Sequence, residues 1–134
     1  KLEEAEIYWH KLKQSLEHFG TELPLLSTLH KTVPLSETAL KRAIGAGLKN
    51  GELHRLSESR YALSHQLLHY CHCVMNARRE GEDLSISNLK ARFQVGRNLT
   101  IELLEYFDAI HFTRRNGNTR VITGGDGIIS KLSK

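Results

Sequence analysis

The spacing of apolar residues in the first half of the chain predicts three successive helices. Between residues 2 and 19, apolar side chains recur every three or four positions, as on the buried face of an amphipathic helix. A short second helix is expected over 25–29. Ser36 is a good N-cap for a third helix, which Asn50-Gly51 ends. The expected buried stripe of this third helix is Ala39, Leu40, Ile44 and Leu48.

Two short extended segments follow the predicted helices. They lie at 52–56 and 60–63, and Ser57-Glu58-Ser59 forms a tight turn between them. The order of elements is therefore helix, helix, short turn, helix and β-hairpin. This is the order of a winged helix, which is a helix-turn-helix motif with a β-hairpin attached.

The second half of the chain repeats this order. A helix over 64–79 precedes a break at Glu80-Gly81-Glu82 and a one-rung strand over 83–86. Ser87 is expected to cap a short helix that ends at Phe93. The remaining predicted elements are a turn at 94–96, a helix from 97 or 98 to 110, and strands at 111–115 and 120–123 around Asn116-Gly117-Asn118. The glycine-rich residues 124–134 are expected to form a frayed tail.

The repeated order predicts an α+β fold that is mostly helical and consists of two tandem winged-helix domains. We expect these domains at 1–63 and 64–134, with no Pro- or Gly-rich linker between them. The chain has 134 residues, so each domain is close to the lower size limit for independent folding. Because the sequence begins with Lys1 rather than Met, we expect it to be a fragment of a longer protein.

The chain is mildly basic, and its positive charge is unevenly distributed. Nineteen Lys and Arg residues face fifteen Asp and Glu residues, and residues 64–134 carry +3 of the net +4. Eight of the ten basic residues in this half lie between Arg78 and Arg120. Such clustering favours a polyanionic partner. No run of about 18 apolar residues is present, so no membrane span is expected. Cys71 and Cys73 would point apart on a helix, which argues against a disulfide and favours a cytoplasmic protein.

The segment from His65 to Cys73 has the composition of a metal site. Residues four apart share a helix face, so His65 and His69 could join His72 or Cys73 there. Zinc takes four ligands, usually from two elements, and the sequence offers no second set. We therefore favour exposed histidines and a buried cysteine over a metal site, and expect no metal and no catalytic residue.

Gly45-Ala46-Gly47 lies within a predicted helix, whereas glycines that open the backbone to a nucleotide lie mainly at strand–helix turns. Close helix packing is the favoured interpretation of these glycines.

Basic residues of the second domain form the best candidate site. The start of its last helix offers backbone N–H groups and the helix dipole to an anion such as phosphate. Neighbouring residues of a strand face opposite ways, so only one of Arg114 and Arg115 can share a face with that helix. The candidate residues are Lys90, Arg92, Gly96, Arg97, Asn98, Arg114, Arg115 and Arg120.

Residues 98–120 read NLTIELLEYFDAIHFTRRNGNTR. The run Leu103–Asp108, followed by Phe112–Arg115 and then Gly117 and Arg120, resembles the last winged-helix domain of the bacterial selenocysteine-specific translation elongation factor. Two small winged helices with a basic second one also resemble the C-terminal region of that factor.

This resemblance implies a non-enzymatic part of a GTPase that carries selenocysteinyl-tRNA to the ribosome. The second domain would bind an mRNA hairpin next to an in-frame UGA codon. The wing arginines and the segment Gln94–Asn98, which adds Gln94 and Val95 to the candidate residues, would make the contacts. GTP and magnesium would bind to a GTPase domain outside this chain, and the chain itself would need no cofactor.

The resemblance also implies a role for the first domain. This domain would be a spacer or hinge, with Lys41 and Arg42 as a second contact to RNA or ribosome. We expect a monomer.

Arg97 is expected to contribute most, through a phosphate contact or by stacking on a flipped base. Lys90, Arg92 and one wing arginine would position the RNA backbone. The sequence differs from that family at two positions. It has Asn98 where the family frequently has Lys, and His111 where the family frequently has Gly. The second leaves the start of the wing strand uncertain, because His tolerates unusual backbone conformations less well than Gly.

Two other functions remain open at this point. A winged helix most often reads the major groove of duplex DNA, so a double-stranded DNA-binding transcription regulator is the main alternative. A protein–protein interaction module is the other alternative, and it would show no salt-dependent binding of nucleic acid.

Overall fold

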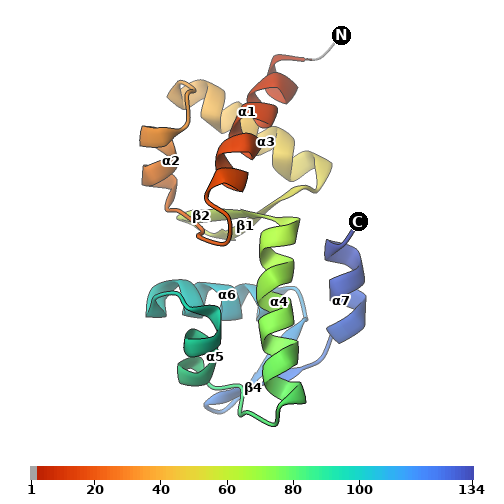
Figure 1. Cartoon of the computed structure of the whole chain (residues 1–134). Coiled ribbons are helices and arrows are strands. Elements are labelled where there is room, and N and C mark those ends of the chain that lie inside the picture. The colour runs from red at the N-terminus through yellow and green to blue at the C-terminus, as the bar shows by residue number, and fades with distance from the viewer. Residues whose placement is uncertain (1–2) are drawn as a thin grey trace. The chain divides into compact units, whose positions relative to one another are not determined.

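The computed structural model describes residues 3–134, which divide into two compact units (Figure 1). The first unit is Lys1–Ser64 and the second is His65–Lys134. This division lies one residue from the boundary expected after Leu63. Leu2, the expected start of the first apolar stripe, lies outside the described residues.

The first unit has the predicted order of elements. It comprises α1 (Glu4–His18), α2 (Leu26–Thr32), α3 (Glu37–Asn50), β1 (Leu53–Ser57) and β2 (Arg60–Leu63). The two strands pair antiparallel. Ser36 caps α3 as predicted, because its Oγ accepts a hydrogen bond from the Ala39 N–H at 3.1 Å. Gly51, with φ of 84°, ends the same helix in the left-handed conformation.

The core of the first unit depends on close contact between α1 and α3. Trp9 is buried against Gly47, where an added Cβ would lie 2.4 Å from the indole ring. The predicted packing role of the glycines is thus confirmed for Gly47, whereas Gly45 faces open space. The predicted burial of Leu48 is wrong, since the face towards Trp9 is occupied by Gly47 and Leu48 is 40% exposed.

Glu52 connects these helices on their polar side. Its carboxylate accepts hydrogen bonds from Trp9 Nε1 at 2.8 Å and from Lys13 Nζ at 2.9 Å. The hydrogen bond from Lys13, followed by that from Trp9, lowers the pKa of the Glu52 carboxyl. The Trp9 ring therefore has its single polar group satisfied at the edge of the core.

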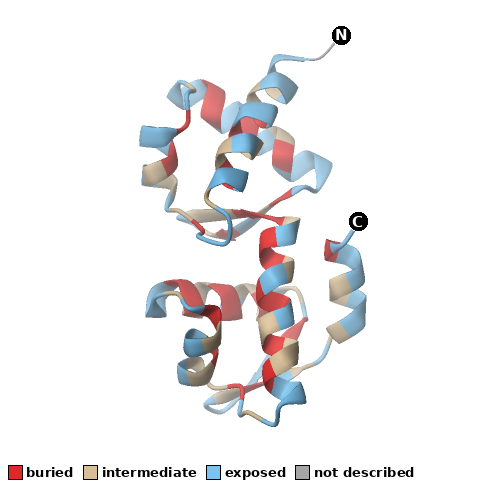
Figure 2. Cartoon of the chain, viewed as in Figure 1, coloured by how far each residue is buried: buried red, intermediate tan, exposed pale blue. Residues whose placement is uncertain are grey.

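The second unit repeats the winged-helix order and adds a final helix. It comprises α4 (Ser64–Arg79), α5 (Ile86–Phe93), α6 (Arg97–Ala109), β3 (Thr113–Asn116), β4 (Thr119–Ile122) and α7 (Gly125–Leu132). Its core lies between α4, α5, α6 and the hairpin (Figure 2). The largest buried side chains there include Tyr70, Phe107 and Phe112. Cys71 is buried as predicted, and burial raises the pKa of its thiol to about 12.

Two turns of the second unit differ from prediction by one or two residues. Ser85, not Ser87, caps α5, because its Oγ accepts a hydrogen bond from the Asn88 N–H at 3.1 Å. Asn116 pairs with Thr119, so the hairpin loop is Gly117-Asn118. Gly117 has φ of 63°, which suits the first central position of a tight hairpin turn. The expected one-rung strand is a single bridge between Ser85 and Thr119.

The prediction of a frayed tail over 124–134 is wrong. Residues Gly125–Leu132 form α7, and Leu132 is buried. Gly124 lies against the His111 carbonyl, and an added Cβ would come within 2.3 Å of that oxygen. The tail is thus attached to the end of α6 at its start and to the core at its end.

His111 closes α6 in an unusual conformation. Its φ is 64°, in the left-handed region that glycine favours. The His111 N–H donates to the Asp108 carbonyl at 3.1 Å, and the Phe112 N–H donates to the Phe107 carbonyl at 2.9 Å. These two bonds form a Schellman motif. The uncertainty over the strand entry is resolved, since His111 adopts the conformation that glycine would supply.

Candidate nucleic-acid interface

The turn between α5 and α6 is exposed between two buried anchors. Phe93 packs edge-on against Tyr70 of α4 with ring centroids 5.1 Å apart, and Leu99 is buried at the start of α6. Gln94 takes a left-handed conformation with φ of 56°, and its N–H donates to the Lys90 carbonyl. The exposed residues of this segment are Gln94, Gly96, Arg97 and Asn98, whereas Val95 is half-buried.

The start of α6 suits an anion. Within the described residues, no side chain caps its first N–H groups, and its first turn contains no acidic residue. The carbonyl of the N-cap residue Gly96 accepts from the Thr100 N–H and hydroxyl, at 3.1 and 2.9 Å. In contrast, α3 and α5 each begin with a serine cap. The helix dipole and the exposed Arg97 therefore favour a phosphate at this end.

Lys90 adds a second cation close to this turn. It is exposed on α5, one helical turn before Gln94. The structure thus brings together Lys90 and the segment Gln94–Asn98, as expected from the sequence. We call Lys90 and Gln94–Asn98 together the turn surface.

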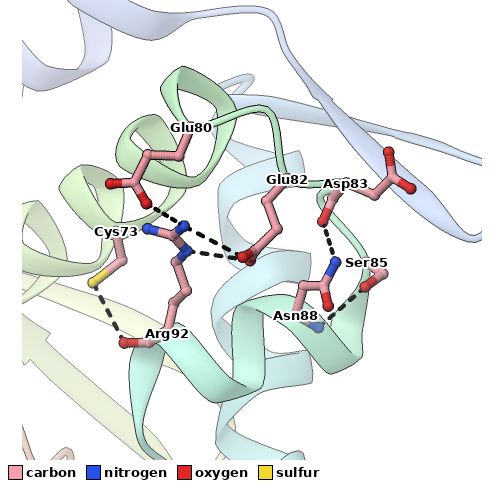
Figure 3. Close-up of polar contacts among 7 residues, drawn as sticks. All are labelled: Cys73, Glu80, Glu82, Asp83, Ser85, Asn88 and Arg92. Carbon is pink, nitrogen blue, oxygen red and sulfur yellow. Dashed lines mark hydrogen bonds and ion pairs between the residues drawn. The ribbon is translucent and has the colours of Figure 1, made fainter.

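Arg92 was expected to contact RNA, but it forms ion pairs with two carboxylates of the same unit. Its Nη2 lies 2.6 Å from Glu80 Oε1, and its Nε lies 3.2 Å from Glu82 Oε1 (Figure 3). The side chain is only 23% exposed. Hydrogen bonds to Glu82 and then Glu80 raise the pKa of the guanidinium. The sequence prediction missed these partners because they lie ten and twelve residues away, across the break after α4.

Arg120 is also paired, and the prediction that it lies on the binding surface is wrong. It is 8% exposed, and its Nη2 lies 3.0 Å from Asp108 Oδ2. The other carboxylate oxygen of Asp108 accepts from the Thr113 hydroxyl at 2.7 Å. The guanidinium therefore faces α6 rather than solvent.

The strand register separates the two remaining wing arginines. Arg115 pairs with Arg120 and shares its face, and Arg115 Nε donates to the Gly117 carbonyl at 3.2 Å. Arg114 pairs with Val121, which is 37% exposed, so both lie on the outer face of the hairpin. Both arginines are exposed, but only Arg115 shares the face that is turned towards α6.

Residues 76–122, which include α5, α6 and the hairpin, match the family model described as elongation factor SelB, winged helix. This segment is similar to the winged helices of elongation factor SelB. The resemblance expected from residues 98–120 is therefore confirmed.

Two SelB relatives align along most of the chain. The selenocysteine-specific elongation factor of Escherichia coli (strain K12) is 28% identical over 120 residues, which cover 90% of this chain and 19% of that protein. The same factor of Haemophilus influenzae is 23% identical over 89% of this chain and 19% of that protein. The chain thus spans about a fifth of the length of these curated relatives.

Two solved SelB structures share the fold. The mRNA-binding domain of elongation factor SelB from E. coli, solved in complex with SECIS RNA, is 27% identical with a TM-score of 0.78. The match covers 92% of this chain and 99% of that one. A bacterial selenocysteine-specific elongation factor, EF-Sec, is 21% identical over 89% of this chain and 19% of that one, with a TM-score of 0.70. The predicted pair of winged helices is confirmed.

The candidate residues outside 76–122 are Lys41 and Arg42 on α3. Both are exposed. Arg42 Nη1 lies 3.7 Å from Glu4 Oε1, and the guanidinium stacks 5.7 Å from the centroid of the Tyr8 ring. Arg42 therefore already packs on α1, which leaves Lys41 as the more accessible cation of the pair.

The His and Cys residues of α4 do not form a metal centre. In the described part of the chain, no three His, Cys, Asp or Glu side chains are arranged to hold a metal ion. Cys71 and Cys73 are both free thiols, and Cys73 Sγ lies 3.9 Å from His69 Nε2. No helix within residues 3–134 is both long enough and apolar enough to cross a membrane.

Proposed function

We propose that this chain binds an mRNA hairpin of the selenocysteine-insertion type through its second unit. The observation that carries the proposal is the likeness, over 92% of the chain, to a SelB mRNA-binding domain whose structure contains SECIS RNA. The hairpin would lie next to an in-frame UGA codon. The start of α6, which among the described residues has no side-chain cap and no acidic residue in its first turn, supports the second unit as the RNA-binding one, and the SelB family match over 76–122 includes this helix.

The turn surface would make the central contacts. A-form RNA has a deep, narrow major groove that side chains cannot read, so loops and bulges with splayed-out bases are the usual targets. The start of α6 would meet the RNA backbone with its N–H groups, and Arg97 would hold a phosphate or stack on a flipped base. Lys90, Asn98 and a wing arginine would fix the position of the backbone.

We also propose that the chain acts as a tether within a longer elongation factor. Such a factor would deliver selenocysteinyl-tRNA to the ribosome in the cytoplasm. GTP and magnesium would bind to its GTPase domain, and the 134 residues here would be monomeric, without enzymatic activity or a cofactor. Lys41 in the first unit would offer a second contact with RNA or ribosome.

The test is a fluorescence titration of the chain with a UGA-adjacent hairpin that contains an unpaired bulge, at several salt concentrations. The matched ligands are an unstructured RNA of the same length and a duplex DNA. We expect hairpin-selective binding whose logarithm falls with log salt by about 0.7–0.9 per phosphate contact.

Arg97→Ala should weaken hairpin binding by about 1–3 kcal/mol. Lys131→Ala, which removes an exposed charge from α7, is the matched control and should leave the affinity nearly unchanged. Equal or tighter binding to duplex DNA would instead support the DNA-binding regulator. Absence of binding to all three ligands would support a protein-interaction module.

A further inference from the structure

Arg92 joins the end of α5 to the end of α4 and lies between Lys90 and Gln94 of the turn surface. It precedes Gln94 by two residues. Its Nη2 contacts Glu80 Oε1 at 2.6 Å and Glu82 Oε2 at 3.3 Å, and its Nε contacts Glu82 Oε1 at 3.2 Å. Figure 3 shows the guanidinium between the two carboxylates. A bidentate contact of this kind fixes the orientation of the guanidinium as well as its distance from the carboxylate.

The two carboxylates are held on a defined piece of backbone. Glu80 and Glu82 flank Gly81, whose φ is 78°. The Gly81 N–H donates to the Arg78 carbonyl and the Glu82 N–H donates to the Ala77 carbonyl, both at 3.0 Å. These bonds form a Schellman motif at the end of α4. Arg92 is therefore attached to a rigid helix end rather than to a loose loop.

Apolar and backbone contacts hold the same turn of α5 from its other sides. Phe93, which is 4% exposed, packs edge-on against Tyr70 of α4. The Arg92 carbonyl lies 3.9 Å from Cys73 Sγ, also on α4. The last turn of α5 is thus bound to α4 immediately before the chain becomes exposed at Gln94.

We propose that Arg92 is a positioning residue that holds the turn surface against α4 and does not itself bind RNA phosphate. This inference rests on the proposed function. Glu80 and Glu82 occupy the guanidinium fork, so a phosphate would have to displace two carboxylates that already carry more negative charge than Arg92 carries positive. The phosphate contacts of this region then belong to Lys90 and Arg97.

The salt dependence of hairpin binding distinguishes positioning from direct contact. Arg92→Gln should weaken binding about three- to tenfold without changing the slope of log affinity against log salt. Arg97→Gln, the comparison variant, should lower that slope by about 0.7–0.9, as loss of one phosphate contact does. A lower slope for Arg92→Gln, or an unchanged affinity, would overturn the proposal.

A pair of acidic variants controls for charge. Glu82→Gln and Asp83→Asn each remove one negative charge from adjacent residues, but the Asp83 carboxylate points away from Arg92 (Figure 3). We expect Glu82→Gln to bind the hairpin less tightly than Asp83→Asn does. Equal or tighter binding by Glu82→Gln would mean that releasing Arg92 does not harm the site, and would contradict its positioning role.

Amide hydrogen exchange without RNA separates this inference from the proposed function. The Gln94 amide donates to the Lys90 carbonyl and the Thr100 amide to the Gly96 carbonyl, so both report on the turn. Both should exchange faster in Arg92→Gln and as in wild type in Asp83→Asn. Unchanged exchange in Arg92→Gln overturns the positioning role, whereas failure of wild type to bind the hairpin overturns only the proposed function. If Arg92→Gln does not fold, Arg92→Lys, which keeps the charge but loses the bidentate contact, takes its place.

Discussion

At the scale of single residues, His111 carries a backbone strain that glycine would relieve. An L-residue in the left-handed region costs about 1–2 kcal/mol, partly offset by the greater chain entropy that glycine loses on folding. We predict that His111→Gly stabilises the second unit by about 0.5–1 kcal/mol. Thermal unfolding followed by circular dichroism should show a midpoint a few degrees higher. A lower midpoint would mean that the imidazole makes contacts worth more than the strain.

The arginines show which parts of the candidate site the sequence could predict. The turn and the start of α6 follow from local signals, so Gln94–Asn98 were placed correctly. The partners of Arg92 are set by tertiary packing, which one-dimensional spacing does not report. In β4, alternation favours burial of apolar Val121 and exposure of Arg120, but the structure has the reverse because Asp108 compensates the inward charge.

At the scale of elements, the contact between α1 and α3 depends on a residue without a side chain. Gly47→Ala places a Cβ 2.4 Å from the Trp9 ring, so we predict a destabilisation of about 1–3 kcal/mol. Gly45→Ala, two residues away on the same helix, faces open space and should stabilise α3 by about 0.5–1 kcal/mol. Denaturant unfolding of both variants is the measurement. Equal effects would show that the ring moves aside at little cost.

The elements also show why some of the fold escaped prediction. Helices with regular apolar spacing and clear ends, such as α3 and α4, were placed within a residue or two. The sequence did not predict the final helix α7, because its glycines favoured a loop over a helix with a short apolar face. That face consists of Ile128, Ile129 and Leu132, of which Leu132 reaches the core. Three apolar residues at helical spacing are too few to outweigh three nearby glycines when only the sequence is considered.

At the scale of the whole molecule, the two units follow one another in the chain without a linker. β2 ends at Leu63 and α4 begins at Ser64, so one peptide bond separates the wing of the first unit from the first helix of the second. We predict a hinge at this junction, which would let the second unit stay on RNA while the rest of a longer factor moves. Small-angle scattering of the free chain should then require more than one arrangement of the units. A single arrangement, identical with and without hairpin RNA, would count against the hinge.

The inward-facing pair of Asp108 and Arg120 has an evolutionary consequence. Loss of Asp108 leaves the buried guanidinium of Arg120 without compensation, whereas replacement of both by apolar residues of similar volume can be neutral. Natural selection should therefore tolerate changes at these positions only in pairs. Among relatives of this chain, positions 108 and 120 should covary, and lineages that lack the carboxylate at one should also lack the guanidinium at the other.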